Sequence, residues 1–213
     1  MGMHQYLKSL SNLEMMNRAP GYFKLEKHTV AAHSFKVAQA AQMLGDIEEN
    51  AGHTIDWRAL YEKALNHDYT ERFIGDIKTP VKYATPELRQ MLADVEESMT
   101  ENFIEDDIPA EFQAAYRRRF SESKDDTLEG KILSVADKID LMYESFGEIQ
   151  KGNPETVYVD IYRESLKTMM DFRELASVQY YLHEILPDLI EDSAGDRDQL
   201  RSITNQIVEN QAK

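Results

Sequence analysis

Residues 60–75 read LYEKALNHDYTERFIG, an apolar helical repeat that runs directly into a histidine and an aspartate. Leu60 and Ala64 stand four residues apart, as on one face of a helix, and Asp56 upstream is a suitable N-cap. Gly75 can adopt the left-handed conformation that ends a helix. The stretch therefore predicts one helix from about Asp56 to the residue before Gly75, with two ionisable side chains where its apolar face should continue.

The remaining sequence predicts helices as well. Glycine and proline, 9 and 6 residues in 213, fall between segments, whereas a β-sandwich or barrel needs them at frequent turns. We therefore expect an all-α fold, a single-domain helical bundle that spans residues 1–213. Apolar periodicity and capping residues predict further helices over 29–44, from 85 onward, over 128–149, from 153–154 onward, over 174–186 and over 198–208.

The chain is strongly acidic, because 24 Lys and Arg against 39 Asp and Glu give a formal charge of −15. Such a protein lacks the basic face that displaces phosphate counterions, so nucleic acid is not an expected partner. The sequence has no apolar run near the ~20 residues of a membrane span, no export signal in its first residues and no cysteine for a disulfide framework. We expect a soluble cytoplasmic protein that binds neither nucleic acid nor membrane.

Four ionisable residues stand where the apolar pattern predicts a core: His33, His67, Asp68 and Asp137. A buried imidazole or carboxylate needs a partner, and one divalent cation satisfies several of them at once. Two imidazoles with two carboxylates suit Mn, Co, Zn, Fe or Ni better than Ca, and Mg stays open. Taken singly, a helical histidine is more often structural. Asp140, three residues after Asp137, competes for the place of the fourth ligand.

Three further residues are candidates for the reaction itself. On a continuing helix Glu71 shares a face with Asp68, so it is either a general acid or base near the metal or a surface partner of its neighbours. Asp76 follows Gly75 on a loop, where it can protonate a leaving hydroxyl, bind a sugar hydroxyl or merely cap a turn. Arg18 lies on an irregular connection, where it either grips a phosphate through two parallel hydrogen bonds or is simply solvated.

The order of these residues resembles that of a known family. His33, then His67-Asp68, then Asp137 on successive helices resembles the H…HD…D signature of the HD-domain metal-dependent phosphohydrolases. A histidine–aspartate pair alone is a weak signal, so the longer matches matter more. Similarity to the bacterial 5′-deoxynucleotidase branch of the family rests on NRAP at 17–20, LNHDYTE at 65–71 and GDIKTPVKY at 75–83.

The resemblance covers about residues 5–190 and implies an HD-type helical domain, with the C-terminal helices at its periphery. It implies one divalent metal ion, a nucleoside 5′-monophosphate as substrate and a homodimer. It also favours Asp137 over Asp140 as the fourth ligand. The site residues are then His33, His67, Asp68 and Asp137 for the metal, Glu71 and Asp76 for catalysis, and Arg18, Ala19, Asp76 and Lys82 for the substrate.

Two positions depart from the branch. Ala19 stands where the branch commonly has an aromatic residue that lines the substrate pocket, and Ala32 stands where it has a glutamate before the first histidine. Neither position is one of the four implied metal ligands. Because Ala19 removes bulk next to the sugar, we expect a weaker preference for deoxyribose than the branch implies.

The predicted function is release of phosphate from nucleoside 5′-monophosphates, with deoxyribonucleotides favoured by the resemblance. A metal ion would acidify the attacking water, and fixed charges such as Arg18 would hold the phosphate. Two alternatives stay open: hydrolysis of another phosphate ester, such as a polyphosphate or signalling nucleotide, and a non-catalytic nucleotide-binding regulatory module. Lys and Arg are sparse near the motifs, which makes a polyphosphate the weaker candidate substrate.

Overall fold

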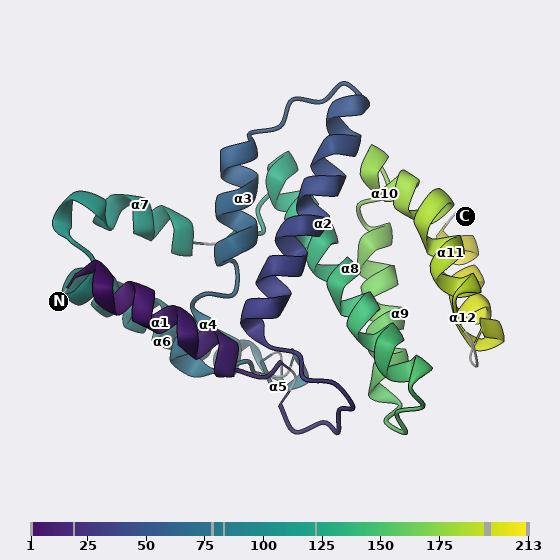
Figure 1. The fold of residues 1–213 in the computed structure, drawn as a ribbon, viewed down its shortest axis with the longest axis horizontal. Coiled ribbons are helices and arrows are strands. Elements are labelled where there is room, and N and C mark those ends of the chain that lie inside the picture. Colours follow the sequence, from purple (N-terminus) through teal and green to yellow (C-terminus); the bar gives the residue numbers. More distant parts are fainter. Residues whose placement is uncertain are drawn as a thin grey trace. The chain divides into compact units, whose positions relative to one another are not determined.

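The computed structural model describes residues 2–18, 20–77, 79–82, 84–121, 123–193 and 197–211, and these residues form helices joined by loops (Figure 1). Within these ranges the extended backbone pairs only at an isolated bridge between Asn17 and Thr29. The predicted all-α fold is thereby confirmed. No helix in this part of the chain is long and apolar enough to cross a membrane.

The helices follow one another along the chain and differ greatly in length. A π-helical segment lies between two of the C-terminal α-helices. In order, they are α1 (Met3–Met15), α2 (Val30–Asn50), α3 (Trp57–Asn66), α4 (Glu71–Ile74), α5 (Thr79–Lys82), α6 (Pro86–Asp107), α7 (Ala110–Phe120), α8 (Leu128–Gln150), α9 (Val157–Met170), α10 (Ala176–Tyr180), the π-helical segment (Tyr181–Ile185), α11 (Leu186–Glu191) and α12 (Arg197–Gln211).

Two long helices begin at threonine caps. The Thr85 hydroxyl accepts a hydrogen bond from the Leu88 amide at 3.1 Å, with Pro86 in the first turn of α6. The Thr127 hydroxyl accepts from the Gly130 amide, also at 3.1 Å, at the start of α8. Both starts were predicted from the sequence and are confirmed. In each case the cap satisfies an amide that has no partner inside the helix.

The helix predicted over 56–74 is wrong in its second half, because α3 ends at Asn66 and α4 follows only after a turn. His67 Nδ1 donates to the Ala64 carbonyl at 2.9 Å, and this is the carbonyl that the Asp68 amide would need in a continuing α-helix. The amides of residues 69 and 71–73 bond three residues back instead, at 3.0–3.3 Å. We call residues 67–74 the His-Asp turn.

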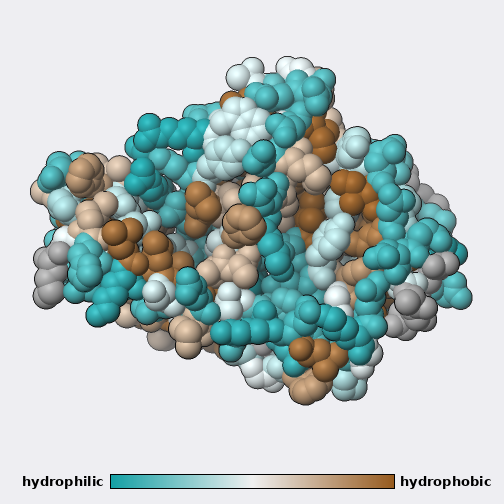
Figure 2. Space-filling view, in the orientation of Figure 1, coloured by the Kyte–Doolittle hydropathy of each residue, from teal (hydrophilic) through white to brown (hydrophobic). Residues whose placement is uncertain are grey.

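One compact unit contains Met1–Tyr22, Lys27–Phe35 and Glu62–Ser123. In this unit α1, α4, α5 and α7 all contact α6. Figure 2 shows apolar side chains over α1, where Leu7 and Leu10 are exposed. The core combines aliphatic and aromatic residues and includes a tyrosine of the His-Asp turn; its buried members are Leu13, Val30, Tyr69, Phe103, Ile104, Ile108 and Tyr116.

A second compact unit contains Phe23–Glu26, Lys36–Tyr61 and Lys124–Lys213. Here α8 packs along α9, and α12 contacts α9 and α11. The helix predicted over 174–186 is present, but it passes through the π-helical segment and continues into α11. The number of domains stays a prediction. The second unit carries Asp137 on α8, whereas the first carries the other predicted site residues.

Candidate metal centre

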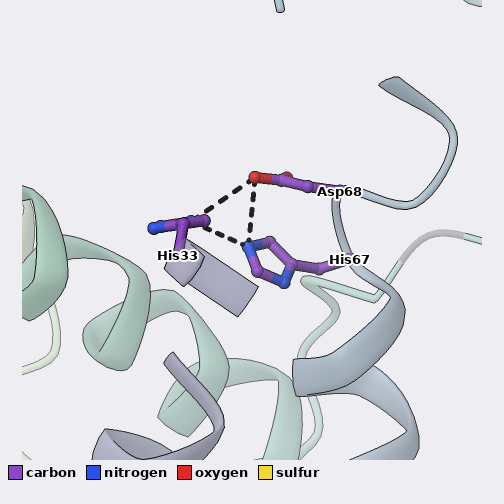
Figure 3. Close-up of side chains that lie close together, drawn as sticks. All are labelled: His33, His67 and Asp68. Atoms are coloured by element: carbon purple, nitrogen blue, oxygen red, sulfur yellow. Dashed lines mark hydrogen bonds and ion pairs between the residues drawn. The ribbon is translucent and has the colours of Figure 1, made fainter. Parts of the chain in front are cut away.

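Three side chains of the first unit converge on one point (Figure 3). His33 Nε2 lies 3.2 Å from His67 Nε2, and each of these atoms lies 3.4 Å from Asp68 Oδ2. The ligand atoms of these residues form one group in which every pair is closer than 4.8 Å. Two imidazole nitrogens and a carboxylate oxygen therefore face one another, as the sequence predicts for three of the four metal ligands.

The chain builds this cluster from two short stretches. His33 lies on the first turn of α2 and is fully buried, at 0% exposure; its amide bonds the Thr29 carbonyl at 2.9 Å. His67 and Asp68 come from the His-Asp turn. Because His67 Nδ1–H donates to the Ala64 carbonyl, a neutral His67 presents the lone pair of Nε2 to the cluster. The bond that interrupts the helix thus also orients a candidate ligand.

The spacing of these atoms fits one divalent cation. Zinc-like ions bind nitrogen and oxygen at about 2.0–2.2 Å, so tetrahedral ligand atoms lie about 3.3–3.6 Å apart. The three separations here are 3.2–3.4 Å. The mixed nitrogen and oxygen set suits a transition metal better than calcium. The residues present can therefore hold the predicted ion, whose identity the ligand set does not fix.

Asp68 is ionised in this environment. Burial raises the pKa of its carboxyl, but the charge and hydrogen bonds of His67 and His33 outweigh burial and hold that pKa well below its ordinary value. A carboxylate that is already deprotonated releases no proton when a cation binds. The two imidazoles therefore keep Asp68 in the anionic form that a metal ligand requires.

Arg18 joins the cluster through Asp68. Its Nη1 donates to Asp68 Oδ2 at 2.7 Å, the same oxygen that faces the two histidines. The Arg18 amide bonds the His28 carbonyl at 2.9 Å, and the neighbouring Asn17 pairs with Thr29. These contacts hold the connection before α2 beside the turn that carries Asp68. A guanidinium can form charge-assisted hydrogen bonds to an anionic group next to the cluster.

Glu71 has a strongly perturbed carboxyl next to the cluster. Burial, then the negative charges of Asp68 and Asp76, raise the pKa of its carboxyl to about 8, although Arg18 and His33 act in the opposite direction. Within the described residues its Oε2 is buried without a hydrogen-bond partner. Asp76 lies on the loop after Gly75 and is half-buried. A carboxyl that holds its proton near neutral pH can act as a proton donor.

The remaining acidic candidates lie on α8. Asp137 is buried, and its Oδ2 accepts from Lys124 Nζ at 2.7 Å and from Lys138 Nζ at 3.1 Å. Asp140 is buried as well and pairs with Lys36 Nζ at 3.5 Å. Lys124 carries no signal in the sequence, because it lies thirteen positions before Asp137, on the loop that precedes α8. The role of Asp137 as fourth ligand stays a prediction.

Two predicted substrate-binding residues are not assigned a contact. Ala19 lies outside the described residues. Lys82 ends α5 and is half-buried. Their roles stay predictions.

The sequence profile of the family described as 5′-deoxynucleotidase YfbR-like matches residues 5–189. Among curated relatives, a 5′-deoxynucleotidase of Shewanella oneidensis is 27% identical over 179 residues, which cover 84% of this chain and 90% of the relative. A 5′-deoxynucleotidase of Photorhabdus laumondii is 27% identical over 186 residues, which cover 87% of this chain and 92% of the relative.

A solved structure is more similar still. The crystal structure of an HD-domain phosphohydrolase from Listeria innocua matches with a TM-score of 0.93 at 60% sequence identity. The match covers 99% of this chain and 100% of that chain. Together with the profile match, this similarity confirms the family and the HD-type fold predicted from the sequence.

Proposed function

This chain belongs to the YfbR-like 5′-deoxynucleotidase family and is thereby a metal-dependent phosphomonoester hydrolase; we propose that its substrates are nucleoside 5′-monophosphates, above all 2′-deoxyribonucleotides. The substrate class is supported by the two curated relatives, both named 5′-deoxynucleotidases. The convergence of His33, His67 and Asp68 is the single observation that carries the proposal.

We assign the cation to His33, His67 and Asp68, with Asp137 as the proposed fourth ligand. When bound, such an ion supplies Lewis acidity, which neutralises phosphate charge and makes water more acidic. Asp68 is a carboxylate in this environment, and the bond from His67 Nδ1 to the Ala64 carbonyl directs Nε2 at the cluster, so both ligand atoms already face the proposed ion. This preorganisation supports a catalytic site over an inert one.

The other residues of the cluster supply binding and proton transfer. Arg18 offers a guanidinium beside Asp68 and would bind the terminal phosphate dianion through charge-assisted hydrogen bonds. Glu71, whose carboxyl has a pKa of about 8 in the metal-free protein, would act as the general acid that protonates the departing 5′-oxygen. Asp76 is the alternative proton donor or a partner of the sugar. These roles remain our assignments.

The proposal is tested by metal content and turnover measured on the same protein, purified without chelator. Phosphate release from a deoxynucleoside 5′-monophosphate is assayed with Mn²⁺, Co²⁺, Zn²⁺ and Mg²⁺. We expect His67→Ala to lose both metal and turnover, because it removes a ligand. Glu71→Gln should keep about one metal per chain and lose roughly 10²–10⁴-fold in kcat, the range of general acid–base groups.

His4→Ala is the matched control, because His4 is an exposed histidine on α1 that the site does not use. It should retain metal and turnover. Turnover of Glu71→Gln within a few-fold of the wild type would remove Glu71 from the mechanism. A wild-type protein that binds metal but releases no phosphate from any monophosphate would overturn the proposed substrate class.

A further inference from the structure

The His-Asp turn has two faces with different contacts. Its hydrogen bonds run three residues back, and side chains at i and i+3 eclipse in such a turn. Asp68 and Glu71 therefore share one face, which carries the metal cluster and the perturbed acid. Tyr69 and Arg72 share another face, where Tyr69 is 2% exposed in the core of the first unit. The second face has no part in the proposed chemistry.

Arg72 clamps this second face. Its Nη1 donates to Tyr69 Oη at 2.7 Å. Its guanidinium carbon lies 4.5 Å from the ring centroid of Phe103 on α6 and 4.7 Å from that of Phe73 on α4. Contacts at this distance are cation–π interactions, and they strengthen as the cation loses water. One side chain thus connects the turn to α6.

The hydrogen bond from Arg72 continues into α1 with a defined direction. Ser9 Oγ donates its single proton to the Tyr6 carbonyl at 2.6 Å. In the 2.7 Å bond between Ser9 and Tyr69, the Tyr69 hydroxyl must therefore be the donor. The Tyr69 oxygen in turn accepts the hydrogen bond from Arg72 Nη1. The chain runs from Arg72 through Tyr69 and Ser9 to the backbone of α1, and we call it the Arg72 relay.

The turn depends on such contacts because it is too short to stabilise itself. α4 has four residues, and one hydrogen-bonded turn does not offset its own conformational entropy. The Tyr69 ring also stacks on Phe120 at 4.3 Å with an interplanar angle of 2°. Thr70 forms a further hydrogen bond to Glu96 on α6. The contacts of the second face with the core therefore fix the positions of Asp68 and Glu71.

We propose that Arg72 is a positioning residue of this enzyme: through the relay and its stacking on Phe103, it holds the His-Asp turn so that Asp68 and Glu71 face the proposed metal centre. The inference rests on the proposed function, since it assigns Arg72 a part in that reaction. The contacts of Arg72 are with the second face of the turn and with Phe103. It acts on kcat by fixing the geometry of residues on the opposite face, where a displacement near 1 Å can cost roughly 10²-fold in rate.

Arg72→Met keeps an apolar stem of similar length and removes the guanidinium. We expect kcat to fall about 10- to 100-fold while KM changes less than about threefold, because Arg18 still binds the phosphate. The visible spectrum of the Co²⁺-loaded protein should change in band position or intensity, because Asp68 is no longer held in the same orientation. Arg72→Lys, which retains a charge over Phe103, should recover part of kcat.

Arg119→Met is the matched control. Arg119 also stacks on a ring of this core, 5.0 Å from the Tyr116 centroid, and bonds Glu62, but it does not contact the His-Asp turn. It should lower the melting temperature to a similar extent and leave kcat and the Co²⁺ spectrum unchanged. Loss of kcat equal to that of Arg72→Met would show a general effect of core stability and overturn the proposal.

Tyr69→Phe interrupts the relay without removing the ring, and it keeps the test valid if Arg72→Met does not fold. Tyr69→Phe should lower kcat. Introducing Arg72→Met into the Tyr69→Phe protein should then lower kcat much less than Arg72→Met lowers it in the wild type, as for residues that act through one another. Additive losses, or a Tyr69→Phe protein with wild-type kcat, would overturn the relay. If the wild type releases no phosphate, the proposed function fails, and the Co²⁺ spectra still decide whether Arg72 positions the turn.

Discussion

At the scale of single residues, Glu71 links the site to pH. Its carboxyl has a pKa of about 8 in the folded protein, against about 4.3 for an unperturbed glutamate in the unfolded chain. The folded metal-free protein therefore binds more protons than the unfolded chain between these values. Protonation of Glu71 stabilises the fold fully below about pH 4, and this contribution is lost as the pH rises through about 8.

We expect the melting temperature of the chelator-treated protein to fall between pH 5 and pH 8, and to fall less steeply in Glu71→Gln, whose side chain does not titrate. Thermal unfolding followed by circular dichroism over that range measures both slopes. Glu14→Gln, on the exposed surface of α1, should keep the wild-type slope. Parallel slopes in the wild type and Glu71→Gln would show that the carboxyl titrates in its ordinary range.

The sequence predicts which ionisable residues cluster better than it predicts the residues that contact them. His33, His67 and Asp68 stand out because each puts an ionisable group into an apolar pattern, and the structure brings these three together. The contacts that tune them come from residues with no such signal. Arg18 reaches Asp68 across fifty positions, and Lys124 reaches Asp137 from a loop. Ion pairs between residues this far apart depend on how the loops pack, and the spacing of residues in the sequence does not predict loop packing.

At the scale of elements, α8 contains two glycines in very different settings. A Cβ at Gly130 would lie 2.5 Å from the Asp125 carbonyl oxygen and 2.7 Å from its amide nitrogen, so the preceding loop would have to move. A Cβ at Gly147 would meet nothing within 4 Å. The loop cannot yield easily, because Thr127 both caps α8 and hydrogen bonds to Asp125.

Gly130→Ala should therefore destabilise the protein by about 1–3 kcal/mol, the usual cost of overpacking, despite the better helix propensity of alanine. Gly147→Ala should stabilise it by up to about 1 kcal/mol, because only the propensity changes. Chemical denaturation of both variants provides the comparison. Equal effects of the same sign would mean that the loop before α8 adapts to the added methyl group.

Elements are predictable where local signals act alone. The caps at Thr85 and Thr127 fix the starts of α6 and α8, and these starts agree with the helices predicted from 85 onward and from 128. The helix predicted over 56–74 is interrupted at His67, whose side chain donates a hydrogen bond to the Ala64 carbonyl of the same helix. Apolar periodicity cannot show that a side chain competes with a backbone amide for this carbonyl. The same turn makes Asp68 and Glu71 neighbours at i+3, so the predicted shared face survives although the predicted helix does not.

At the scale of the whole molecule, composition defines classes but not assembly. The charge of −15 and the helical pattern predict an acidic all-α protein, and the fold agrees. A single domain, a homodimer and a cytoplasmic location stay predictions, because none of them follows from helix periodicity or from the charge. The charge does bear on substrate choice, since every added phosphate brings more negative charge to an already anionic protein.

The number of phosphates on the substrate should therefore affect turnover. Arg18 and one cation can hold a terminal phosphate dianion, whereas a triphosphate needs further charge-assisted contacts worth about 1.5–3 kcal/mol each. We expect kcat/KM for a deoxynucleoside triphosphate to be roughly 10- to 100-fold below that of its monophosphate, and the gap to narrow as salt screens the repulsion. The ribonucleoside monophosphate should differ less than about 100-fold from the deoxy form, the limit for excluding one hydroxyl by shape. Phosphate release followed at two ionic strengths compares all three substrates. A gap between mono- and triphosphate that is insensitive to salt would mean that shape, not charge, selects the substrate, and faster release from the triphosphate would contradict the monophosphate assignment itself.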